Sequence, residues 1–420
     1  MRKCLLIAHD FPPAGGGGVQ RPLKFVKYLP AFGWTTVVLT ARRRVSVVED
    51  PTLLTEVPSD VPVIRAWNPD LKEVMMGVGR RLGISYGAID RLGAITLFPD
   101  DEVGWLFAAL ARGSSLCRKH RFDAIFATGG PWSSLMVGGF LSSYYRIPWI
   151  ADFRDPWTEA DNSVFATTLH RALAGRVQRL LLRRAAAVVV ASPGMGNRMR
   201  MNFPETASKI TTITNGYDED DFSSVHLSNS KEFVVVFSGT LYAKRDPGVF
   251  LAGLRRFIDD HPAAEEDMAV RFMGRIPQGY KLEIDRLGLS NVVKYEGYQP
   301  HATAVRMVRE ATALVLVQAF RTDKSVGILG KLFEYLRSMR PMLYVGSPGE
   351  TSDIIEKFKA GVTVTTPDLG LVASAIAGLY SKWKDGVPYS HIKVEELACY
   401  ERKHLTSYLA NVLDQVVTTS

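Results

Sequence analysis

The stretch VGILGKLFEYLRSMRP, residues 326–341, places one acidic side chain inside an otherwise apolar helical pattern. Gly327 and Gly330 precede this pattern, Glu334 is the acid, and the strand pattern MLYVG follows at once. The glycines let backbone amides face a ligand where the helix begins, and the apolar residues pack inward at helical spacing. A carboxylate at that place can accept two hydrogen bonds from neighbouring hydroxyl groups, such as those of a ribose. The alternative is a surface glutamate on a packed helix.

Length and composition indicate a two-domain protein of a reducing compartment. With 420 residues, 46% of them apolar, the chain can form two sizeable cores. Cys4, Cys117 and Cys399 are far apart in the sequence and lack metal-ligand spacing, which predicts free thiols and no disulfide framework. The eight histidines form no ligand pair either. We therefore expect no metal site.

The N-terminus predicts a buried strand, because the apolar run in MRKCLLIAHDFPP is too short for a signal peptide. No run elsewhere approaches the roughly 20 apolar residues that a membrane span needs. We expect a cytoplasmic protein that is soluble or peripheral on the inner face of the plasma membrane.

Charge is uneven along the chain. Residues 1–222 carry +6 of the net charge of +8, mostly as arginine, which suits phosphates and anionic headgroups. A scattered solvated surface explains most of these arginines. The sequence has no zinc spacing, no long basic helix and no RNA-binding aromatic motif, so nucleic acid is not an expected partner.

Short β-branched runs alternate with longer amphipathic stretches along the whole chain, which is typical of parallel βαβ units. A polar linker, SSVHLSNSK at 223–231, interrupts the alternation once. We predict an α/β protein of two doubly wound, Rossmann-like domains, residues 1–222 and 231–395, with a cleft between the carboxyl ends of their sheets. Residues 396–416 are predicted to form a final helix that packs back across the first domain. The expected strands are CLLIA, TTVVLT, VPVIR, DAIFAT, IPWIA, AAVVVAS and ITTIT, then FVVVFSG, MAVRFMG, NVVKYEG, TALVLV, PMLYVG and GVTVT.

Both halves open with a strand, a glycine turn and a helix. In the first half, Gly15 to Gly18 let the chain approach a ligand without a Cβ clash. Their spacing does not fit a dinucleotide fingerprint, and the second strand ends in Arg42 to Arg44 instead of an acid. NAD binding is therefore disfavoured, while an NADP site that uses these arginines stays open.

The glycine turn of the second half, FSGTLYAKRDP, carries two cations. Gly239 ends the strand, and Lys244 and Arg245 come just before the helix that Pro247 can start. Two cations beside a helix N-terminus can hold a diphosphate. A solvated loop is the alternative.

The stretch IADFRDPW at 150–157 ends the fifth strand with three charged side chains, Asp152, Arg154 and Asp155. Three charges cannot all be buried unpaired, so they should pair with one another or face the cleft. Trp157 offers a flat apolar surface of the kind on which sugars stack. An Arg–Asp brace is the alternative, with Asp152 as its structural member and Asp155 as the first choice for a ligand contact.

Seven motifs in order resemble those of the retaining nucleotide-sugar glycosyltransferases of the GT-B fold, the group that makes bacterial polysaccharides and glycolipids. They cover nearly the whole chain: FPPAGGGGVQR, TGGPWSS at 128–134, IADFRDPW, ITNGYD at 213–218, FSGTLYAKRD, YEGY at 295–298 and GKLFEYLRSMRPML. The resemblance implies transfer of a sugar from a nucleotide-sugar donor to a saccharide or polyprenyl-linked acceptor. It also implies retention of configuration, and neither a metal nor a cofactor.

The resemblance assigns roles to individual residues. Glu334 matches the glutamate that binds the donor ribose, and Lys244 or Arg245 matches the cation on the donor diphosphate. The implied donor site comprises Glu334, Lys331, Gly239, Thr240, Gly297, Tyr298, Gly327, Ile328, Gly16 and Gly17. The implied acceptor site comprises Arg154, Asp155, Trp157 and Trp132, and Lys244, Arg245 and Asp155 are the expected catalytic residues.

Three departures from the family pattern bear on the donor sugar. Val326 stands where a first glutamate is common, and Thr240 stands where an arginine often follows the glycine. The histidines that many members carry after the fourth and fifth strands are absent, since these positions read TGGPW and DFRDPW. Two other functions stay open, a sugar-nucleotide epimerase of the same build and a non-catalytic nucleotide-sugar-binding subunit. The acid run at 219–221, Glu219 to Asp221, is expected in a turn and not in a metal site.

Residues 71–98 combine many apolar residues with Arg80, Arg81 and Arg91. Enzymes of this type often take a lipid-linked acceptor, and a basic segment with so much apolar surface can lie in a headgroup layer. An anionic membrane surface is thus a further expected partner. The alternative is an insertion packed on the core, because five glycines interrupt any long helix.

Overall fold

The computed structural model describes residues 1–42, 48–158, 165, 167–223, 231–242, 244–321, 326–387 and 392–418. The chain divides into two compact units, Met1–Thr214 with Arg402–Ser420 and Asn215–Glu401. The first unit thus ends at Thr214, before the boundary at 222 that the sequence suggested, because the Tyr217 amide donates a hydrogen bond to the Tyr400 carbonyl within the second unit (3.1 Å). Most of the predicted linker, 224–230, lies outside the described residues.

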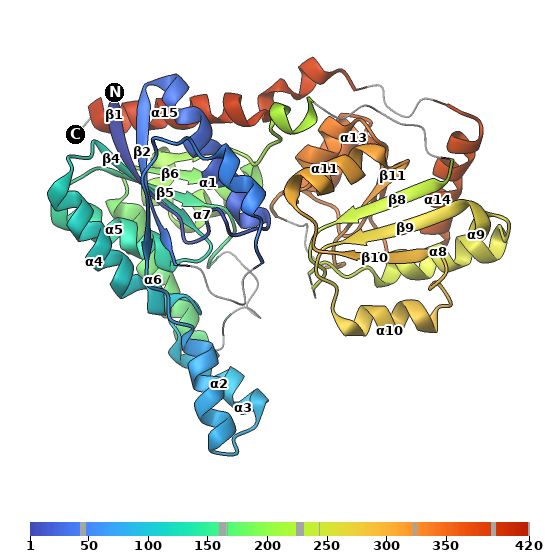
Figure 1. Ribbon diagram of the computed structural model, residues 1–420, viewed down its shortest axis with the longest axis horizontal. Coiled ribbons are helices and arrows are strands. Elements are labelled where there is room, and N and C mark those ends of the chain that lie inside the picture. Colours follow the sequence, from blue (N-terminus) through green and yellow to red (C-terminus); the bar gives the residue numbers. More distant parts are fainter. Residues whose placement is uncertain are drawn as a thin grey trace. The chain divides into compact units, whose positions relative to one another are not determined.

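The first domain is built on a seven-stranded sheet in the order β3-β2-β1-β4-β5-β6-β7 (Figure 1). Every pairing in this sheet is parallel. The central strands are buried along most of their length, as expected for a sheet covered on both faces. The strands are β1 (Arg2–Ile7), β2 (Trp34–Ala41), β3 (Val63–Ala66), β4 (Ala124–Gly129), β5 (Trp149–Phe153), β6 (Ala187–Val190) and β7 (Ile210–Thr212).

Apart from α2 and α3, the helices of this domain cover the sheet, with the C-terminal helix among them. Leu405, Leu409 and Leu413 of α15 pack in one core cluster with Leu23 of α1 and Phe126 of β4. The predicted C-terminal helix therefore starts at residue 402 instead of 396, and lies on the first domain. The helices are α1 (Gly17–Tyr28), α2 (Leu71–Arg81), α3 (Tyr86–Thr96), α4 (Val103–Lys119), α5 (Ser133–Tyr145), α6 (Thr168–Arg184), α7 (Pro193–Asn202) and α15 (Arg402–Thr418), with 3₁₀ turns η1 (Leu29–Phe32), η2 (Pro51–Glu56) and η4 (Pro204–Lys209).

The second domain has a six-stranded sheet in the order β10-β9-β8-β11-β12-β13, again with parallel pairings. Its strands are β8 (Phe233–Ser238), β9 (Met268–Met273), β10 (Val293–Gly297), β11 (Ala313–Val317), β12 (Met342–Val345) and β13 (Gly361–Val364). Its helices are α8 (Gly248–Asp260), α9 (Ala264–Asp267), α10 (Gln278–Arg286), α11 (His301–Glu310), α12 (Leu332–Ser338), α13 (Glu350–Lys357) and α14 (Leu369–Lys384), with 3₁₀ turns η5 (Glu219–Phe222) and η6 (Val394–Tyr400).

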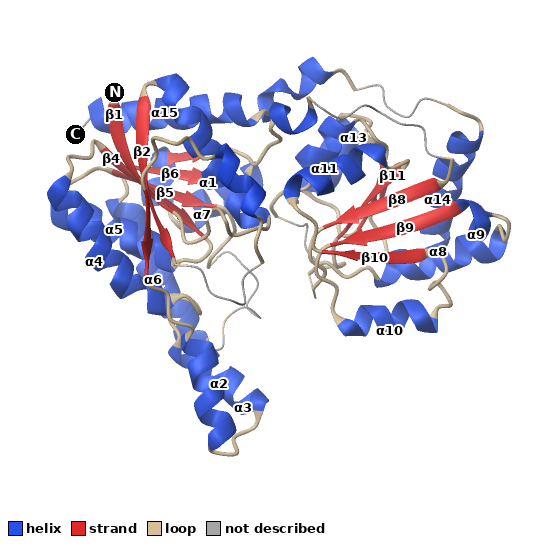
Figure 2. Ribbon diagram, viewed as in Figure 1, coloured by secondary structure: helices blue, strands red, loops and turns tan. Residues whose placement is uncertain are grey.

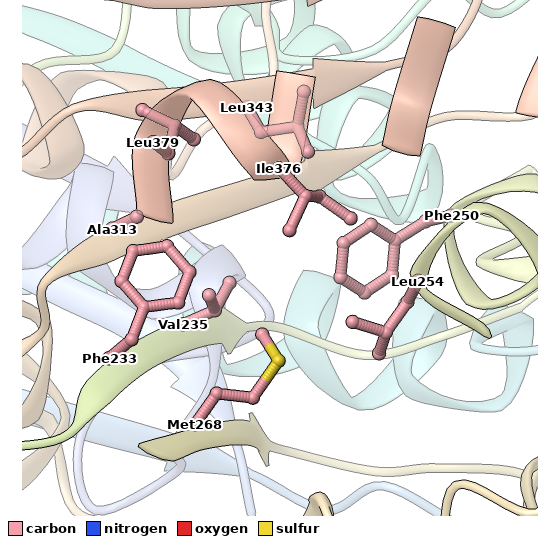
Figure 3. Close-up of a pocket in the computed structure, with 9 residues that line it drawn as sticks. All are labelled: Phe233, Val235, Phe250, Leu254, Met268, Ala313, Leu343, Ile376 and Leu379. Atoms are coloured by element: carbon pink, nitrogen blue, oxygen red, sulfur yellow. The ribbon is translucent and has the colours of Figure 1, made fainter. Parts of the chain in front are cut away.

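A small apolar pocket lies inside the core of the second domain, between its sheet and helices α8 and α14 (Figure 3). All nine lining side chains are apolar, so the pocket offers a nucleotide no polar partner. The lining residues are Phe233, Val235, Phe250, Leu254, Met268, Ala313, Leu343, Ile376 and Leu379.

All thirteen predicted strands are confirmed, and with them the doubly wound α/β architecture of each domain. Strand order reverses beside β1 and β4 in the first sheet and beside β8 and β11 in the second. In such sheets ligands bind outside the carboxyl ends of the strands at the point of reversal. The loops after these four strands are therefore the places to look for sites.

Helices α2 and α3 form a hairpin that projects from the sheet of the first domain (Figure 2). The two helices approach closely at Gly79, where an added Cβ would lie 2.0 Å from the Ile89 side chain. Gly83, with φ +68°, makes the turn between them. The glycines thus allow two short helices where the sequence excluded one long helix. Among the described residues, no helix is long and apolar enough to span a membrane.

Candidate functional site

Helix α12 is fastened to the carboxyl end of β8 in the second domain. The Ser238 amide at the end of that strand donates a hydrogen bond to the Tyr335 hydroxyl (2.7 Å). The pKa of Tyr335 is raised overall, chiefly by burial. The charge of Glu334 adds to this rise, whereas the hydrogen bond with the Ser238 amide and the charge of Arg245 oppose it. Arg245 Nη1 lies 3.2 Å from the place that a Cβ on Gly239, the residue after Ser238, would take, so the helix of Glu334 and the cation-bearing loop meet at one strand end.

Glu334 is a mostly buried, ionised carboxylate. Its neighbours Leu332, Phe333 and Tyr335 pack into the core, while its side chain keeps 13% exposure. Lys331 donates a hydrogen bond to Glu334 Oε2 (2.7 Å). Burial raises the pKa of Glu334, but the charges of Lys331 and His301 and the Lys331 hydrogen bond outweigh it, so that the pKa is lowered overall. The second oxygen, Oε1, has no hydrogen bond from any described residue.

His301 was missed in the sequence, because a single histidine at a helix start carries no motif. It begins α11, is 9% exposed, and its Nε2 lies 2.9 Å from Asp221 Oδ2. Glu219 of the same acid run accepts a hydrogen bond from Arg337 (Nε–Oε2, 2.7 Å). The run lies in a 3₁₀ turn, Glu219–Phe222, in agreement with the turn that the sequence predicted.

Three glycines close the carboxyl ends of β8, β9 and β10. Gly239, Gly274 and Gly297 all have φ between +65° and +153°. A Cβ on Gly274 would lie 2.1 Å from the Gly239 carbonyl oxygen, so only glycine fits there. The sequence identified Gly239 and Gly297 but missed Gly274. The loop side chains next to them are open, because Thr240 is exposed and Tyr298 is 38% exposed.

The two cations after β8 make no ion pair with any described carboxylate. The Arg245 guanidinium lies over the Tyr242 ring (5.4 Å to its centroid), and its Nη1 is 3.2 Å from the place a Cβ on Gly239 would take. Arg245 Nε is buried without a hydrogen-bond partner among the described residues. Lys244 is exposed, and its carbonyl accepts a hydrogen bond from the Ala319 amide after β11 (3.0 Å). Arg245 is thus the cation closer to the strand end.

The loop before α12 is folded against α13. The Gly327 amide donates to Glu350 Oε2 (2.8 Å), and the Leu329 amide donates to Thr351 Oγ1 (3.1 Å). The Gly327 amide that the resemblance assigns to the donor phosphate is thus occupied by a carboxylate. Ile328 and Val326 beside it are half-buried.

Asp152 of the first domain is fully buried and paired. Its two oxygens accept hydrogen bonds from Arg21 Nη2 (2.7 Å) and Nε (3.0 Å), and Thr128 Oγ1 adds a third (2.7 Å). Arg21 is itself 1% exposed and also donates to the carbonyls of Ile213 and Thr214. Asp152 is therefore the structural member of its motif, as the sequence suggested.

Arg154 fastens two glycine loops to each other. Its Nε donates to the Gly129 carbonyl (2.8 Å), and its two terminal nitrogens donate to the carbonyls of Gly18 and Gly130. Asp155 is exposed and has no partner among the described residues. Its Oδ2 lies 3.5 Å from the place of a Cβ on Gly130. Arg154 therefore shapes the edge of the sheet, while Asp155 is open to a ligand.

Trp157 does not present the free surface that its sequence position suggested. It is 2% exposed, and its ring stacks on that of Trp132 with centroids 5.0 Å apart and planes 7° apart. The half-buried Trp132 is the member of the pair that can meet a ligand.

The glycine loop after β1 is open where the resemblance places the donor sugar. Gly16, with φ +94°, and Gly17 are exposed, and nothing lies within 4 Å of a Cβ built on either. Arg43 and Arg44, on which the NADP alternative rests, lie outside the described residues. The sequence also missed a cluster at the end of β1, in which the buried His9 lies between the partly exposed Asp10 and Glu102.

Residues 16–216 match the family described as glycosyl transferase 4-like domain. No curated protein sequence matches the chain. Similar solved structures include sucrose-phosphate synthase from Thermosynechococcus elongatus, with a TM-score of 0.69, 15% identity and coverage of 100% of both chains.

Two further solved structures are similar over almost their whole length. The lipopolysaccharide outer core galactosyltransferase WaaB has a TM-score of 0.62 and 13% identity, over 99% of each chain. A mutant of S. aureus TarM in complex with fondaparinux, alpha-GlcNAc-glycerol and UDP has a TM-score of 0.66 and 11% identity, over 99% of this chain and 100% of TarM. Residues 16–216 thus match a glycosyl transferase 4-like domain, and the two doubly wound domains of the chain share the GT-B fold of these structures.

Proposed function

We propose that the second domain binds a nucleotide-sugar donor and that the first binds a saccharide or polyprenyl-linked saccharide acceptor, to which the sugar is transferred with retention of configuration. The observation that carries this proposal is the Ser238–Tyr335 hydrogen bond, because it fixes the helix of Glu334 at the strand end beside Arg245. A carboxylate for two ribose hydroxyls is thus held near a cation for a diphosphate, which pairs with no carboxylate among the described residues. TarM, of the same fold, was solved with UDP.

The proposed step needs positive charge beside the departing diphosphate and an acceptor oxygen held close to the anomeric carbon. The acceptor oxygen forms a bond to the anomeric carbon, the bond from that carbon to the diphosphate breaks, and the acceptor proton passes to a diphosphate oxygen. Lys244 and Arg245 neutralise the charge that grows on the departing diphosphate. Residues described in the second domain offer no carboxylate pair beside these cations, and Glu334 is engaged with Lys331. The proposal therefore uses a single displacement on one face of the sugar.

Glu334→Ala is expected to weaken donor binding without unfolding the chain. The loss of one or two charge-assisted hydrogen bonds costs about 1.5–3 kcal/mol each, which is roughly a tenfold to hundredfold rise in Kd per bond. Calorimetric titration with the nucleotide sugar that gives the largest thermal shift in a panel measures this directly. Glu310→Ala, which removes an exposed glutamate from α11 of the same domain, is the matched control. Equal donor affinity in wild type and Glu334→Ala would remove Glu334 from the donor site.

An epimerase of the same fold and a non-catalytic binding subunit remain the competing functions. An epimerase converts the nucleotide sugar in the absence of any acceptor, whereas a binding subunit shows the thermal shift without turnover. Val326, in place of a first glutamate, is the feature that favours the binding subunit. Products formed from the nucleotide sugar with and without an acceptor distinguish all three.

We further propose that the α2–α3 hairpin docks on an anionic membrane, where a lipid-linked acceptor would be found. Its apolar side chains are open to solvent, with Val74 59%, Leu82 68%, Tyr86 68% and Leu92 52% exposed. An insertion packed on the core would bury these residues. Arg81 and Arg91 are exposed beside them and have no acidic partner among the described residues. Cations flanking exposed apolar residues suit a headgroup layer.

Liposome flotation tests whether the hairpin binds an anionic membrane. Full-length protein is expected to float with phosphatidylglycerol vesicles and not with phosphatidylcholine vesicles, and to lose flotation when Arg80, Arg81 and Arg91 become glutamate. The change of Arg118, Lys119 and Arg121 to glutamate alters the net charge by the same amount before the amino end of β4, away from the hairpin that follows the carboxyl end of β3, and should leave flotation intact. No flotation in either lipid, or equal loss in both variants, would remove the hairpin as a membrane contact.

A further inference from the structure

An open pocket of about 540 Å³ lies at the amino end of the sheet of the first domain, before strands β4 and β5. Its walls are the end of α4 with the loop that leads to β4, the end of α5 with the loop that leads to β5, and Val417 near the end of α15. A volume of this size suits a small-molecule ligand. The glycine loops and the Asp155 loop follow the carboxyl ends of strands, so this pocket is a separate place in the fold.

Four cationic side chains line the pocket. Arg118 and Lys119 stand in the last turn of α4, Arg121 lies in the loop that follows, and Arg146 caps the end of α5. All four are exposed, and none of their side chains makes an ion pair or a hydrogen bond with another described residue. The fold thus brings cations from two loops to one pocket and supplies them with no acid partner among the described residues.

Among the described residues that line the pocket, Asp123 carries the one carboxylate. Its Oδ2 accepts a hydrogen bond from the Lys3 amide (2.7 Å), and the Asp123 amide donates to the Lys3 carbonyl (2.8 Å). Asp123 therefore fastens the loop before β4 to the start of β1. It offsets the charge of the pocket in part but pairs with none of the four cations.

The ends of the three helices at the pocket account for only part of its positive charge. A helix C-terminus carries roughly half a negative charge, which favours cations in the last turn. Four cations and Asp123 sum to +3, and the ends of α4, α5 and α15 together contribute about −1.5, so about +1.5 is left without compensation. A pocket lined by one sign of charge raises the local concentration of counter-ions. The excess charge therefore points to an anionic ligand.

The rest of the lining is suited to the uncharged part of such a ligand. Phe122 is buried beneath the pocket, and Tyr145, Ile147 and Pro148 are half-buried in its wall. The Tyr145 hydroxyl donates to the Ser114 carbonyl of α4 (3.2 Å), which fixes the end of α5 against α4. The pocket is larger than a bare phosphate ion needs, so it has room for an organic group beside the anion.

We propose that this pocket binds a soluble phosphate ester of small-molecule size, with the phosphate held by the arginines at its rim. Arginine suits this role because its planar guanidinium can donate two parallel hydrogen bonds to phosphate oxygens. Apolar and aromatic side chains of the wall meet the organic part of the ester. The inference goes beyond the proposed sugar transfer and does not depend on it.

Calorimetric titration tests the pocket with pyrophosphate and glucose 6-phosphate as probes and glucose as the uncharged counterpart. The full chain carries Lys244→Gln and Arg245→Gln in every titration, so that the cations proposed for the donor diphosphate do not contribute. We expect both phosphate compounds to bind this parent protein and to raise its melting temperature, and glucose to do neither. Binding of glucose as tight as that of glucose 6-phosphate would contradict a phosphate site.

Two pairs of arginines locate the binding. Arg121→Gln combined with Arg146→Gln is expected to raise the Kd of both phosphate compounds by about tenfold or more, because charge-assisted hydrogen bonds are lost. Arg176→Gln combined with Arg184→Gln removes two exposed cations from α6 of the same domain and should change Kd by less than twofold. Circular dichroism shows whether each variant is folded.

Liposome flotation distinguishes a soluble ester from the phosphate of a lipid headgroup. The variant with Arg121→Gln and Arg146→Gln should float with phosphatidylglycerol vesicles to the same extent as wild type. Reduced flotation of this variant would assign the pocket to a headgroup and overturn the soluble ester. Absence of phosphate binding in the parent protein, or equal Kd values for the two arginine pairs, would overturn the site itself. No titration contains a nucleotide sugar, so failure of the proposed sugar transfer leaves these results unaffected.

Discussion

Replacement of Lys244 and Arg245 together by glutamine is expected to lower the rate of sugar transfer by about a hundredfold or more. Removal of one preorganised group that stabilises growing negative charge typically costs about 10²–10³ in kcat, because the interaction is strongest in the transition state. Neither cation is paired with a described carboxylate, so both charges remain available to the diphosphate. Initial rates with saturating donor measure the effect.

Single variants decide which cation matters more. Arg245→Gln should lower the rate more than Lys244→Gln, since the Arg245 guanidinium lies at the Gly239 strand end whereas Lys244 is exposed. Lys294→Gln combined with Lys382→Gln removes two exposed cations of the same domain and serves as the control. Turnover of the Lys244–Arg245 double variant within twofold of wild type would place the diphosphate elsewhere.

Asp152→Ala is expected to lower the free energy of unfolding of the first domain by about 3–5 kcal/mol, because it leaves the charge of Arg21 buried without its acid. Both side chains are at most 1% exposed, so water cannot replace the lost partner. Urea unfolding followed by circular dichroism gives the difference. Asp155→Ala, three residues further on and exposed, should change the stability by less than about 0.5 kcal/mol.

A second variant separates the cost of the unpaired buried charge from the cost of the volume that the alanine leaves empty. Arg21→Met combined with Asp152→Leu should recover much of the lost stability, because an apolar pair of similar volume leaves no buried charge. A loss below about 1 kcal/mol for Asp152→Ala alone would contradict a fully desolvated pair.

The sequence predicts the architecture well because buried parallel strands are read from short β-branched runs. Glu334 could also be singled out because it stands in an apolar helical stretch, and Lys244 and Arg245 because they follow the glycine turn at the end of a predicted strand. Asp152 was correctly expected to be the structural acid of its motif. These predictions depend on local pattern alone.

Sequence reasoning missed what only the folded chain brings together. No motif near His9 in the sequence predicts its contact with Glu102. The contact of His301 with Asp221 likewise joins elements that are far apart in the chain. Trp157 looked free because a sequence cannot show that Trp132 stacks on it. The domain boundary shifted to Thr214 for a similar reason, because Tyr217 bonds to a residue near the other end of the second domain.

The most direct test of the proposed transfer uses a nucleotide sugar whose sugar moiety carries a label, and follows where that label goes. Full-length protein is incubated with the best-bound nucleotide sugar, with and without an octyl glycoside or a polyprenyl-linked saccharide, and the products are separated. We predict that the label passes to the acceptor with one nucleoside diphosphate released for each sugar transferred, and that the anomeric configuration is kept. Label that stays on an isomerised nucleotide sugar without any acceptor, or a donor that binds and is never consumed, would contradict sugar transfer.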